Sequence, residues 1–470
     1  MLFNSLEFAI FLPIVFAIYW LLQKRLQLQN LFVVIASYVF YGWWDWRFLL
    51  LIACTSLCSW GSGLLIGKYL TQPSLKGRSK FWLWLNIAIN IGILAVFKYY
   101  DFFVGEFGAL FGINTSRLLL RVILPVGISF YTFQALSYSI DVYRGNIKPT
   151  KDIIVFFAFI SFFPQLVAGP IERATNLLPQ FMQNRTFHYE QGVDGMRQIV
   201  WGLFKKIVIA DNCATYVDQV WSTYGTQSGS TLLLAAVLFT FQIYGDFSGY
   251  SDIAIGTAKL FGIKLMRNFN NPYFSRDIAE FWRRWHISLT SWFRDYVYIP
   301  LGGSRNGQWR TIANTFVVFL LCAIWHGANW TYIVWGLYHV LLFIPFLLQN
   351  CTHRYKSGER KEEGVKNVLR MLLTFVLVMI GWIIFRAPTV ADAWGYISSI
   401  CAAGWEWPYM TDYALWVAIA MIGVMLGFEW HYRNTDSVPF PCNMWTTYIL
   451  IALIWWFAGH HTEDFIYFQF

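Results

Sequence analysis

Residues 311–349 read TIANTFVVFLLCAIWHGANWTYIVWGLYHVLLFIPFLLQ and contain no Asp, Glu, Lys or Arg. The run divides after His326 into two apolar segments, 311–326 and 330–349. A helical segment of roughly 20 apolar residues matches the hydrocarbon thickness of a bilayer. This stretch therefore predicts two membrane helices that are joined by a short polar break.

The same pattern extends over the whole chain of 470 residues. Hydrophobic residues make up 57% and charged residues 13%, about half the charged fraction of a typical soluble protein. We expect a polytopic, all-α membrane bundle of about eleven spanning helices, with additional interfacial or re-entrant helices. It would form a single membrane-embedded domain over residues 1–470, with a catalytic core at about 120–345. The candidate spanning segments are 6–22, 29–44, 47–66, 81–98, 119–140, 152–168, 231–262, 311–326, 330–349, 368–386, 412–428 and 444–459.

The loops predict the orientation and explain the net charge of +9. Basic residues gather in three loops, which should face the cytoplasm under the positive-inside rule; these are Lys68, Lys76, Arg78 and Lys80, then Arg144, Lys148 and Lys151, then Arg354, Lys356, Arg360, Lys361 and Lys366. The stretch 387–411 has acidic but no basic residues and should lie outside. The start, Met1–Glu7, lacks the positive charge of a signal peptide, so we expect a first membrane helix with its N-terminus outside. No nucleic-acid-binding motif is present, and a nucleic-acid partner is not expected.

Two further features limit the possible functions. The seven cysteines are scattered and form no CxxC pair, which predicts neither a disulfide framework nor a metal site. In the stretch 195–222, Lys205 and Lys206 interrupt an apolar run. Since two lysines at the bilayer centre are costly, we expect this stretch to be an interfacial amphipathic helix.

Ionisable residues inside apolar segments mark candidate functional sites, because lipid makes them costly. The stretch YGDFSGYSD at 244–252 places Asp246 and Asp252 in such a segment, together with a Gly245-xxx-Gly249 step. One interpretation is close helix packing, with the acids paired locally. The other is a tunnel lining. Either way the acids need partners, for which an arginine from the next segment is a candidate.

The stretch 277–296 has helical spacing of its aromatic residues and carries several cations. Arg283, His286, Thr290 and Arg294 would share one helix face. This face is interpreted either as a basic interfacial helix that touches lipid headgroups or as a mouth that binds phosphates, which suit the fork of arginine.

His326 is the third candidate. Fifteen residues of helix from Thr311 place it roughly 22 Å along a bilayer core of about 30 Å. Burial favours the neutral imidazole, which is a suitable general base at neutral pH. The alternative is that His326 only makes a structural hydrogen bond. Because the helix breaks at Gly327 and Asn329 is close by, a functional role for His326 is as well supported as a structural one.

Taken together, these segments resemble the membrane-bound O-acyltransferase family, and within it the bacterial alginate O-acetyltransferase branch. The resemblance covers most of the chain, with its motifs in order: LPVGISFYTFQ at 124–134, FPQLVAGPI at 163–171, YGDFSGYSD at 244–252, residues 281–290 with YIPLGG at 298–303, WHG at 325–327 and FIYFQF at 465–470.

The resemblance implies a helical bundle around a central tunnel. In it, His326 matches the essential histidine of the family and His286 a second important one. It also implies a multi-pass protein of the bacterial inner membrane that has no bound cofactor and uses acetyl-CoA, or another acyl donor, as substrate. An extracytoplasmic partner acyltransferase and an exported polysaccharide as final acceptor are implied as well.

On this basis Arg283, Arg284 and Arg294 are expected to hold the donor's phosphates while His326 accepts the proton of an attacking hydroxyl. Asn329 or a tryptophan N–H such as that of Trp325 would stabilise the oxyanion, and Asp246 and Asp252 would line the tunnel. A rival within the family is D-alanyl transfer to teichoic acids from a carrier protein. Lipid or peptidoglycan acceptors are also open. Rivals of other classes are a secondary transporter and a scaffold for polysaccharide export.

Overall fold

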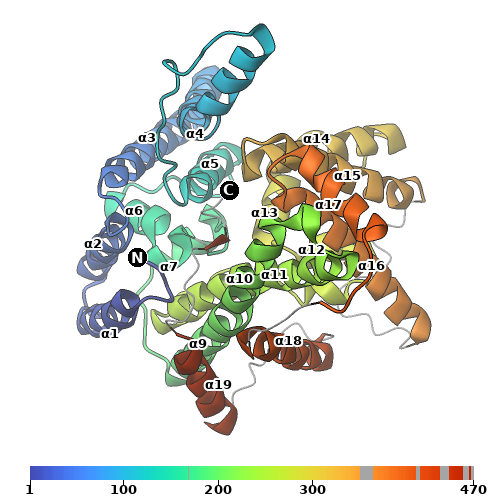
Figure 1. Ribbon diagram of the computed structural model, residues 1–470. Coiled ribbons are helices and arrows are strands. Elements are labelled where there is room, and N and C mark those ends of the chain that lie inside the picture. Colours follow the sequence, from blue (N-terminus) through green and yellow to red (C-terminus); the bar gives the residue numbers. More distant parts are fainter. Residues whose placement is uncertain (168, 350–363, 409–412, 434–443, 459–464, 467–470) are drawn as a thin grey trace. The chain divides into compact units, whose positions relative to one another are not determined.

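The computed structural model describes residues 1–470 except 168, 350–363, 409–412, 434–443, 459–464 and 467–470 (Figure 1). The described residues form helices and no strands. They divide into two compact units: unit 1 is Met1–Ile199 with Ile253–Met266, and unit 2 is Val200–Asp252 with Arg267–Phe470. The basic residues 354–361 and part of the C-terminal motif lie outside the described residues. The prediction of a single domain with its core at 120–345 stays a prediction.

Unit 1 contains the first half of the chain. Its helices are α1 (Leu6–Leu21), α2 (Leu26–Gly42), α3 (Arg47–Leu70), η1 (Pro73–Leu75), α4 (Lys76–Phe111), α5 (Ile128–Arg144), α6 (Ile153–Ser161), α7 (Phe163–Leu166), α8 (Ala174–Phe181) and most of α9 (Tyr189–Leu203). The last residues of α11 also belong to it.

Unit 2 contains the three candidate sites. Its helices are the π-helical turn η2 (Phe204–Ala210), α10 (Asp211–Ser222), η3 (Tyr224–Thr226), α11 (Gly229–Leu260), η4 (Pro272–Phe274), α12 (Ile278–Arg284), α13 (Ile287–Phe293), the π-helical turn η5 (Arg294–Tyr298), α14 (Gln308–His326), α15 (Trp330–Leu348), α16 (Val365–Arg386), α17 (Val390–Ala402), α18 (Tyr413–Tyr432) and α19 (Met444–Phe457).

Seven of the described helices are long and apolar enough to cross a membrane: α3, α4, α11, α14, α15, α16 and α18. Three shorter apolar helices, α1, α2 and α19, accompany them. The prediction of an all-α, polytopic membrane fold is therefore confirmed. Exposed large apolar side chains cover many of these helices, as a lipid-facing surface requires.

Two predicted spanning segments were wrong in their extent. The segment 119–140 begins its helix only at Ile128, because Pro125 precedes it and Gly127 takes a left-handed φ of 74°. The segment 152–168 forms the short helices α6 and α7. These are separated at Phe162, whose ψ of 107° leaves the helical region, and Pro164 lies in the first turn of α7, where its missing N–H removes no helical hydrogen bond.

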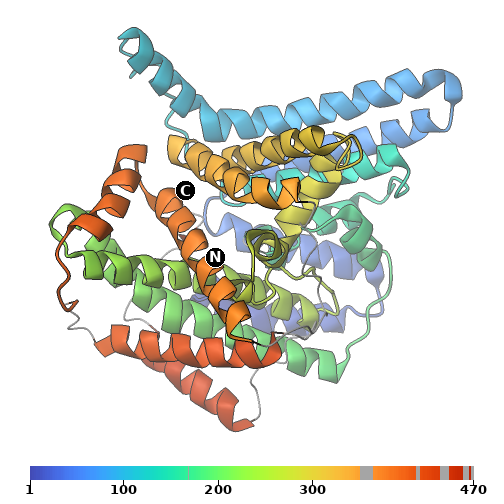
Figure 2. The same cartoon turned by 90° about the vertical axis from the view of Figure 1, so that its right-hand side faces the viewer.

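Inside unit 1, polar side chains join α3, α4 and α5. Ser59 donates to the side-chain oxygen of Asn86 at 3.1 Å, and the side-chain amide of Asn86 donates to the Ser139 hydroxyl at 2.8 Å. Small residues allow the close approach: a Cβ on Gly63 would lie 2.4 Å from a ring carbon of Tyr138. In lipid, burial of apolar surface gives no driving force for helix association. Membrane helices therefore associate through close packing at small residues and through buried hydrogen bonds. Figure 2 shows α3 and α4 side by side.

In unit 2, α14 and α15 form a helical hairpin, and α16 packs against α15 (Figure 2). A Cβ on Gly336 of α15 would lie 2.9 Å from the Ala323 Cβ and 3.0 Å from the Phe319 carbonyl oxygen on α14. The break of the hairpin at Gly327, predicted from the sequence, is confirmed: α14 ends at His326 and Gly327 is extended. This hairpin places His326 at a helix end that lies inside the protein.

The stretch 195–222 is helical as expected, but its lysines are placed differently from the prediction. Lys205 and Lys206 lie in η2 and are 3% and 1% exposed. Lys205 forms an ion pair with a carboxylate of α11, and Lys206 forms one with a carboxylate of α11 and one with Asp211 of α10. These pairs offset the desolvation cost on which the prediction of an interfacial position was based.

Candidate active site

His326 lies at the C-terminal end of α14 in an aromatic enclosure. Its ring packs nearly perpendicular to three aromatic rings. The distances between ring centroids are 5.2 Å to Trp335, 5.1 Å to Phe385 and 4.9 Å to the adjacent Trp325. The side chain is buried, with 6% of its surface exposed. The imidazole is therefore buried among aromatic side chains of α14, α15 and α16.

The residues after His326 are held in place by tight packing and hydrogen bonds. A Cβ on Gly327 would lie 2.4 Å from a ring carbon of Tyr332, so only glycine fits there without a shift. Asn329 begins α15: its side-chain oxygen accepts from the Thr331 N–H at 3.0 Å, and its amide donates to the Pro388 carbonyl at 2.9 Å. Asn329 thus caps the helix that follows the break, with both ends of its amide engaged.

His286, the second predicted histidine, separates α12 from α13. Its backbone takes a left-handed conformation with a φ of 45° and a ψ of 53°, which is unusual for a residue other than glycine. Asn268 holds this turn: its carbonyl accepts from the Ile287 N–H at 2.9 Å, and its side-chain oxygen accepts from the Ser288 hydroxyl at 2.6 Å.

The structure brings the two histidines to one tryptophan. The His286 ring lies 5.9 Å from the Trp325 ring, which lies 4.9 Å from the His326 ring. Phe247 of α11 closes the other side of His286 at 4.7 Å. Neither ring nitrogen of His286 has a hydrogen-bond partner within the described part of the chain. Trp325 is therefore the shared wall between the two imidazoles.

Complete burial lowers the pKa of His286 to about 3. The imidazole is therefore neutral at physiological pH and offers one donor and one acceptor. It is suited to hydrogen bonding with a bound substrate and not to holding an anion by charge.

His286 should make the protein sensitive to acid. The folded pKa lies below the ordinary value of 6.5, so between pH 6.5 and about 3 the unfolded chain binds more protons. The stabilising contribution of neutral His286 is present above pH 6.5 and is lost as the pH falls, by up to about 1.4 kcal/mol per pH unit. Thermal unfolding in detergent from pH 7 to pH 4 should show a shallower decline for His286→Asn than for the wild type. Parallel declines would contradict the burial of His286.

The predicted single basic face at 277–296 was wrong, because the break at His286 separates the residues that would share it. Arg294 pairs with Asp295 at 2.7 Å on an exposed part of the chain. Arg284 instead donates to Glu280 at 2.8 Å and to the Asn270 carbonyl at 3.4 Å. Arg283 is half-buried on α12. Only Arg283 and Arg284 remain neighbours.

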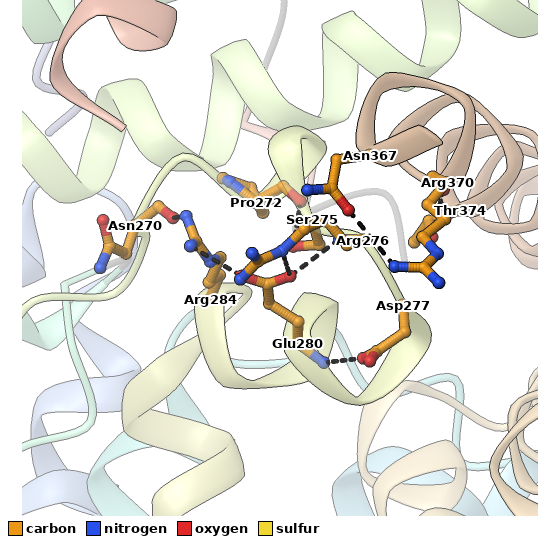
Figure 3. Close-up of polar contacts among 10 residues, drawn as sticks. All are labelled: Asn270, Pro272, Ser275, Arg276, Asp277, Glu280, Arg284, Asn367, Arg370 and Thr374. Atoms are coloured by element: carbon orange, nitrogen blue, oxygen red, sulfur yellow. Dashed lines mark hydrogen bonds and ion pairs between the residues drawn. The ribbon is translucent and has the colours of Figure 1, made fainter. Parts of the chain in front are cut away.

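Arg284 belongs to a cluster that the sequence did not indicate (Figure 3). Arg276 contacts the same carboxylate, with its Nε 3.1 Å from the Glu280 Oε2. Burial opposes the charge of Glu280, but the hydrogen bonds from Arg276 and the charge of Arg284 lower the pKa of this carboxyl below its usual value. The start of α16 lies beside them and adds Arg370, which donates to Asn367 at 3.3 Å. Two arginines thus share the buried carboxylate of Glu280, and Arg370 lies on the neighbouring start of α16.

Asp246 and Asp252 form ion pairs with lysines that precede them in the chain, and the charge of Arg267, from the segment that follows, also interacts with Asp252. Lys205 lies 2.5 Å from the Asp252 carboxylate and donates to Ser248 at 2.8 Å. Lys206 bridges Asp246 at 2.8 Å and Asp211 at 2.7 Å.

The interpretation of Gly245 and Gly249 as a packing motif is confirmed. A Cβ on Gly249 would lie 2.7 Å from the Gly202 carbonyl oxygen, and one on Gly245 would lie 3.0 Å from the Lys205 carbonyl. Gly249→Ala should therefore lower the stability by about 1–3 kcal/mol through overpacking, measured by thermal unfolding in detergent. The exposed helical position Gly92, where an added Cβ meets nothing within 4 Å, is the matched control, and Gly92→Ala should not lower it.

Comparisons with known proteins show to which family the chain belongs. Residues 147–386 match the model of the membrane-bound O-acyltransferase family. The chain belongs to this family. It is 41% identical to the probable alginate O-acetylase AlgI of Pseudomonas aeruginosa, over 86% of this chain and 76% of that protein. With the AlgI of Pseudomonas putida the identity is 39%, over 93% and 90%.

A peptidoglycan O-acetyltransferase of Helicobacter pylori is 36% identical, over 84% of this chain and 78% of that protein. The chain is therefore an O-acyltransferase and a multi-pass membrane protein, as the sequence predicted. The matched range contains α12 to α16 and with them His286, His326 and the arginine cluster.

Proposed function

We propose that this O-acyltransferase transfers an acetyl group from a cytoplasmic thioester donor, acetyl-CoA, towards an exported polysaccharide, with His326 as general base. The observation that carries the proposal is the enclosure of His326 at an interior helix end, with His286 on the far side of Trp325. The aromatic side chains around the buried imidazole exclude water, which would otherwise hydrolyse the thioester.

The proposed reaction assigns a role to each part. His326 takes the proton of an acceptor hydroxyl as the oxygen attacks the thioester carbonyl. The new C–O bond forms, the C–S bond breaks, and the thiolate leaves with a proton from the imidazolium. The indole rings of Trp325 and Trp335 lie beside this ring, and an N–H of one of them would stabilise the oxyanion. Asn329 then acts by holding the loop after His326.

The donor's phosphates are proposed to bind at Arg283 and Arg284 with Arg276 and Arg370. The start of α16 follows the most basic loop of the chain, which the positive-inside rule assigns to the cytoplasm. Arg370 lies in the second turn of this helix, which packs against η4, just before Arg276 in the chain (Figure 3). The exposed pair Arg294–Asp295 has a smaller part in this proposal than the sequence suggested.

The proposed location, partner protein and acceptor are those that the resemblance of the sequence implies. The protein lies in the bacterial inner membrane with its N-terminus outside, and an extracytoplasmic acyltransferase receives the acetyl group. The names of the relatives favour alginate-like polysaccharides, and peptidoglycan second, as the final acceptor.

Membrane vesicles of both orientations test the proposal. Labelled acetyl-CoA should acetylate co-purified glycan only in inside-out vesicles, in which the cytoplasmic face meets the donor. Arg276→Gln and Arg370→Gln should raise the KM for acetyl-CoA, whereas Arg294→Gln should change it little. Label that enters from the outer face would contradict a cytoplasmic donor. Transfer only from a D-alanyl carrier protein would favour the rival donor.

A further inference from the structure

Arg185 is a buried cation of unit 1 that has no carboxylate partner among the described residues. It lies in the loop between α8 and α9 and is 5% exposed. Its Nη2 donates to the side-chain oxygens of Asn30 at 2.5 Å and Gln29 at 2.8 Å, whereas its Nη1 makes a long bond of 3.5 Å to the Gln180 carbonyl oxygen. These partners are neutral, so they satisfy N–H groups without neutralising the charge. A buried charge is costly without a counter-ion, which favours an anion from outside the chain.

The hydrogen bonds of Arg185 connect it to two segments that carry further cations. Its partner Gln29 on α2 donates its backbone N–H to the Arg25 carbonyl at 2.9 Å, so Arg25 lies one helical turn before Gln29. Its partner Gln180 on α8 exchanges two hydrogen bonds with the backbone of Lys264, at 2.8 Å and 2.9 Å. Arg25 and Lys264 are therefore each separated from Arg185 by a single glutamine.

The three stretches that meet at Arg185 carry an excess of positive charge. They are residues 20–30, 180–190 and 260–266, and against their lysines and arginines stands a single acid, Glu190. Besides Arg185, their cations are exposed and form no ion pair within the described part of the chain; these are Lys24, Arg25 and Lys264. This corner of unit 1 therefore attracts anions.

Exposed apolar side chains lie beside these cations. Phe187, two residues after Arg185, packs edge-on against Trp20 with 5.4 Å between ring centroids, yet its outer side stays exposed. Leu21, at the end of α1, is exposed as well. A soluble phosphate would contact only the cations, whereas a phospholipid places its phosphate on the cations and its acyl chains along the apolar side chains.

We propose that Arg185, Lys24, Arg25 and Lys264 bind the phosphate of an anionic phospholipid such as phosphatidylglycerol. We call these four residues the lipid-phosphate site. A guanidinium fork binds two phosphate oxygens at once, and the weakly bonded Nη1 of Arg185 has a further N–H to donate. Basic pockets between membrane helices on the cytoplasmic side are typical sites for anionic head groups, and the positive-inside rule assigns the turn at Lys24 and Arg25 to that side.

The lipid-phosphate site is independent of the proposed acyl transfer. It lies within unit 1, whereas His326 and the arginines proposed for the donor belong to unit 2. A bound phosphate would neutralise Arg185 and so stabilise the packing of α1, α2 and α8, which all contribute to its surroundings. The protein should therefore be more stable with an anionic than with a zwitterionic lipid.

Native mass spectrometry of the full chain in detergent micelles tests the site, with phosphatidylglycerol and phosphatidylcholine added as competing probes. The wild type should retain phosphatidylglycerol in preference. Arg25→Gln combined with Lys264→Gln removes two exposed cations and should weaken this binding about fivefold for each, the usual effect of one cation near an anionic lipid. Lys76→Gln combined with Lys80→Gln is the matched control, because it removes the same charge from another exposed basic segment of unit 1, and it should leave the binding unchanged.

Arg185→Gln should weaken the binding as well, and the exposed pair decides the inference if this variant does not fold. No preference for phosphatidylglycerol in the wild type would overturn the inference, as would unchanged binding by the exposed pair. An equal loss in the Lys76 and Lys80 control would overturn it too, because it would indicate general surface charge.

Soluble competitors separate a lipid from other phosphates. Displacement of phosphatidylglycerol by an equal concentration of glycerol 3-phosphate would indicate a site for soluble phosphates, and displacement by coenzyme A would assign the site to the donor; either result would contradict the inference. His326→Ala should bind phosphatidylglycerol as the wild type does, so this inference and the proposed base fail separately.

Discussion

His326→Ala should reduce acyl transfer by at least about 10²–10⁴-fold, the usual contribution of a general base. The imidazole ends a helix inside an aromatic enclosure, and the tryptophan and phenylalanine rings that contact it cannot accept a proton in its place. The measurement is the acetyl content of the exported polysaccharide in cells that lack the native gene and carry the variant.

The controls separate loss of the base from loss of the protein. His326→Gln keeps a polar side chain of similar reach but cannot act as a base at neutral pH, so it should be as inactive as His326→Ala. His188→Ala changes an exposed histidine and should be fully active. The amount of each variant in the membrane should be equal. Normal acetylation by His326→Gln would exclude a general-base role and favour a scaffold function.

Lys206→Met should destabilise the protein by about 3–5 kcal/mol, the cost of breaking a buried ion pair. Lys206 contacts Asp211 and Asp246, and all three are nearly inaccessible to solvent. Removing the ammonium leaves two carboxylates without their shared partner, whereas methionine fills a similar volume. Thermal unfolding in detergent measures the loss.

Two further variants make this prediction specific to buried charge. Lys259→Met removes a lysine whose partner, Asp194, is half exposed, and should cost less than about 1 kcal/mol. Adding Asp246→Asn to Lys206→Met should restore part of the stability, because one of the uncompensated charges is then absent. If Lys259→Met cost as much as Lys206→Met, burial of the ion pair would not be the cause.

Some of the site could be read from the sequence. Within the charge-free run 311–349, the glycine at 327 predicts the end of a helix, because glycine is common just after helix ends. The helix α14 does end at His326. His339 of α15, whose ring lies 5.0 Å from that of Trp335, was equally visible, because it is also an ionisable residue in an apolar run. It was not singled out, because the helical pattern continues on both sides of it without a break.

Other features depend on contacts that are distant in sequence. The pairing of Lys206 with Asp246 joins residues 40 positions apart, so a rule based on the cost of lone lysines predicted an interface instead. The helical spacing of 277–296 continues through Trp285 and His286, which carry no breaking signal. The turn there is imposed by Asn268 through tertiary hydrogen bonds. Its disruption of the basic face could therefore not be predicted from periodicity.

The left-handed backbone at His286 also bears on how natural variation at this position should be interpreted. Few residue types accept a φ of 45°, and asparagine and glycine are among them, whereas β-branched residues are not. Selection at position 286 therefore acts on the main chain as well as on the ring. Substitution by glycine deletes the imidazole and relieves the strain, while valine deletes it and adds strain. Relatives that have lost the chemistry but kept the fold should consequently drift towards glycine or asparagine at this position, and not towards valine or isoleucine.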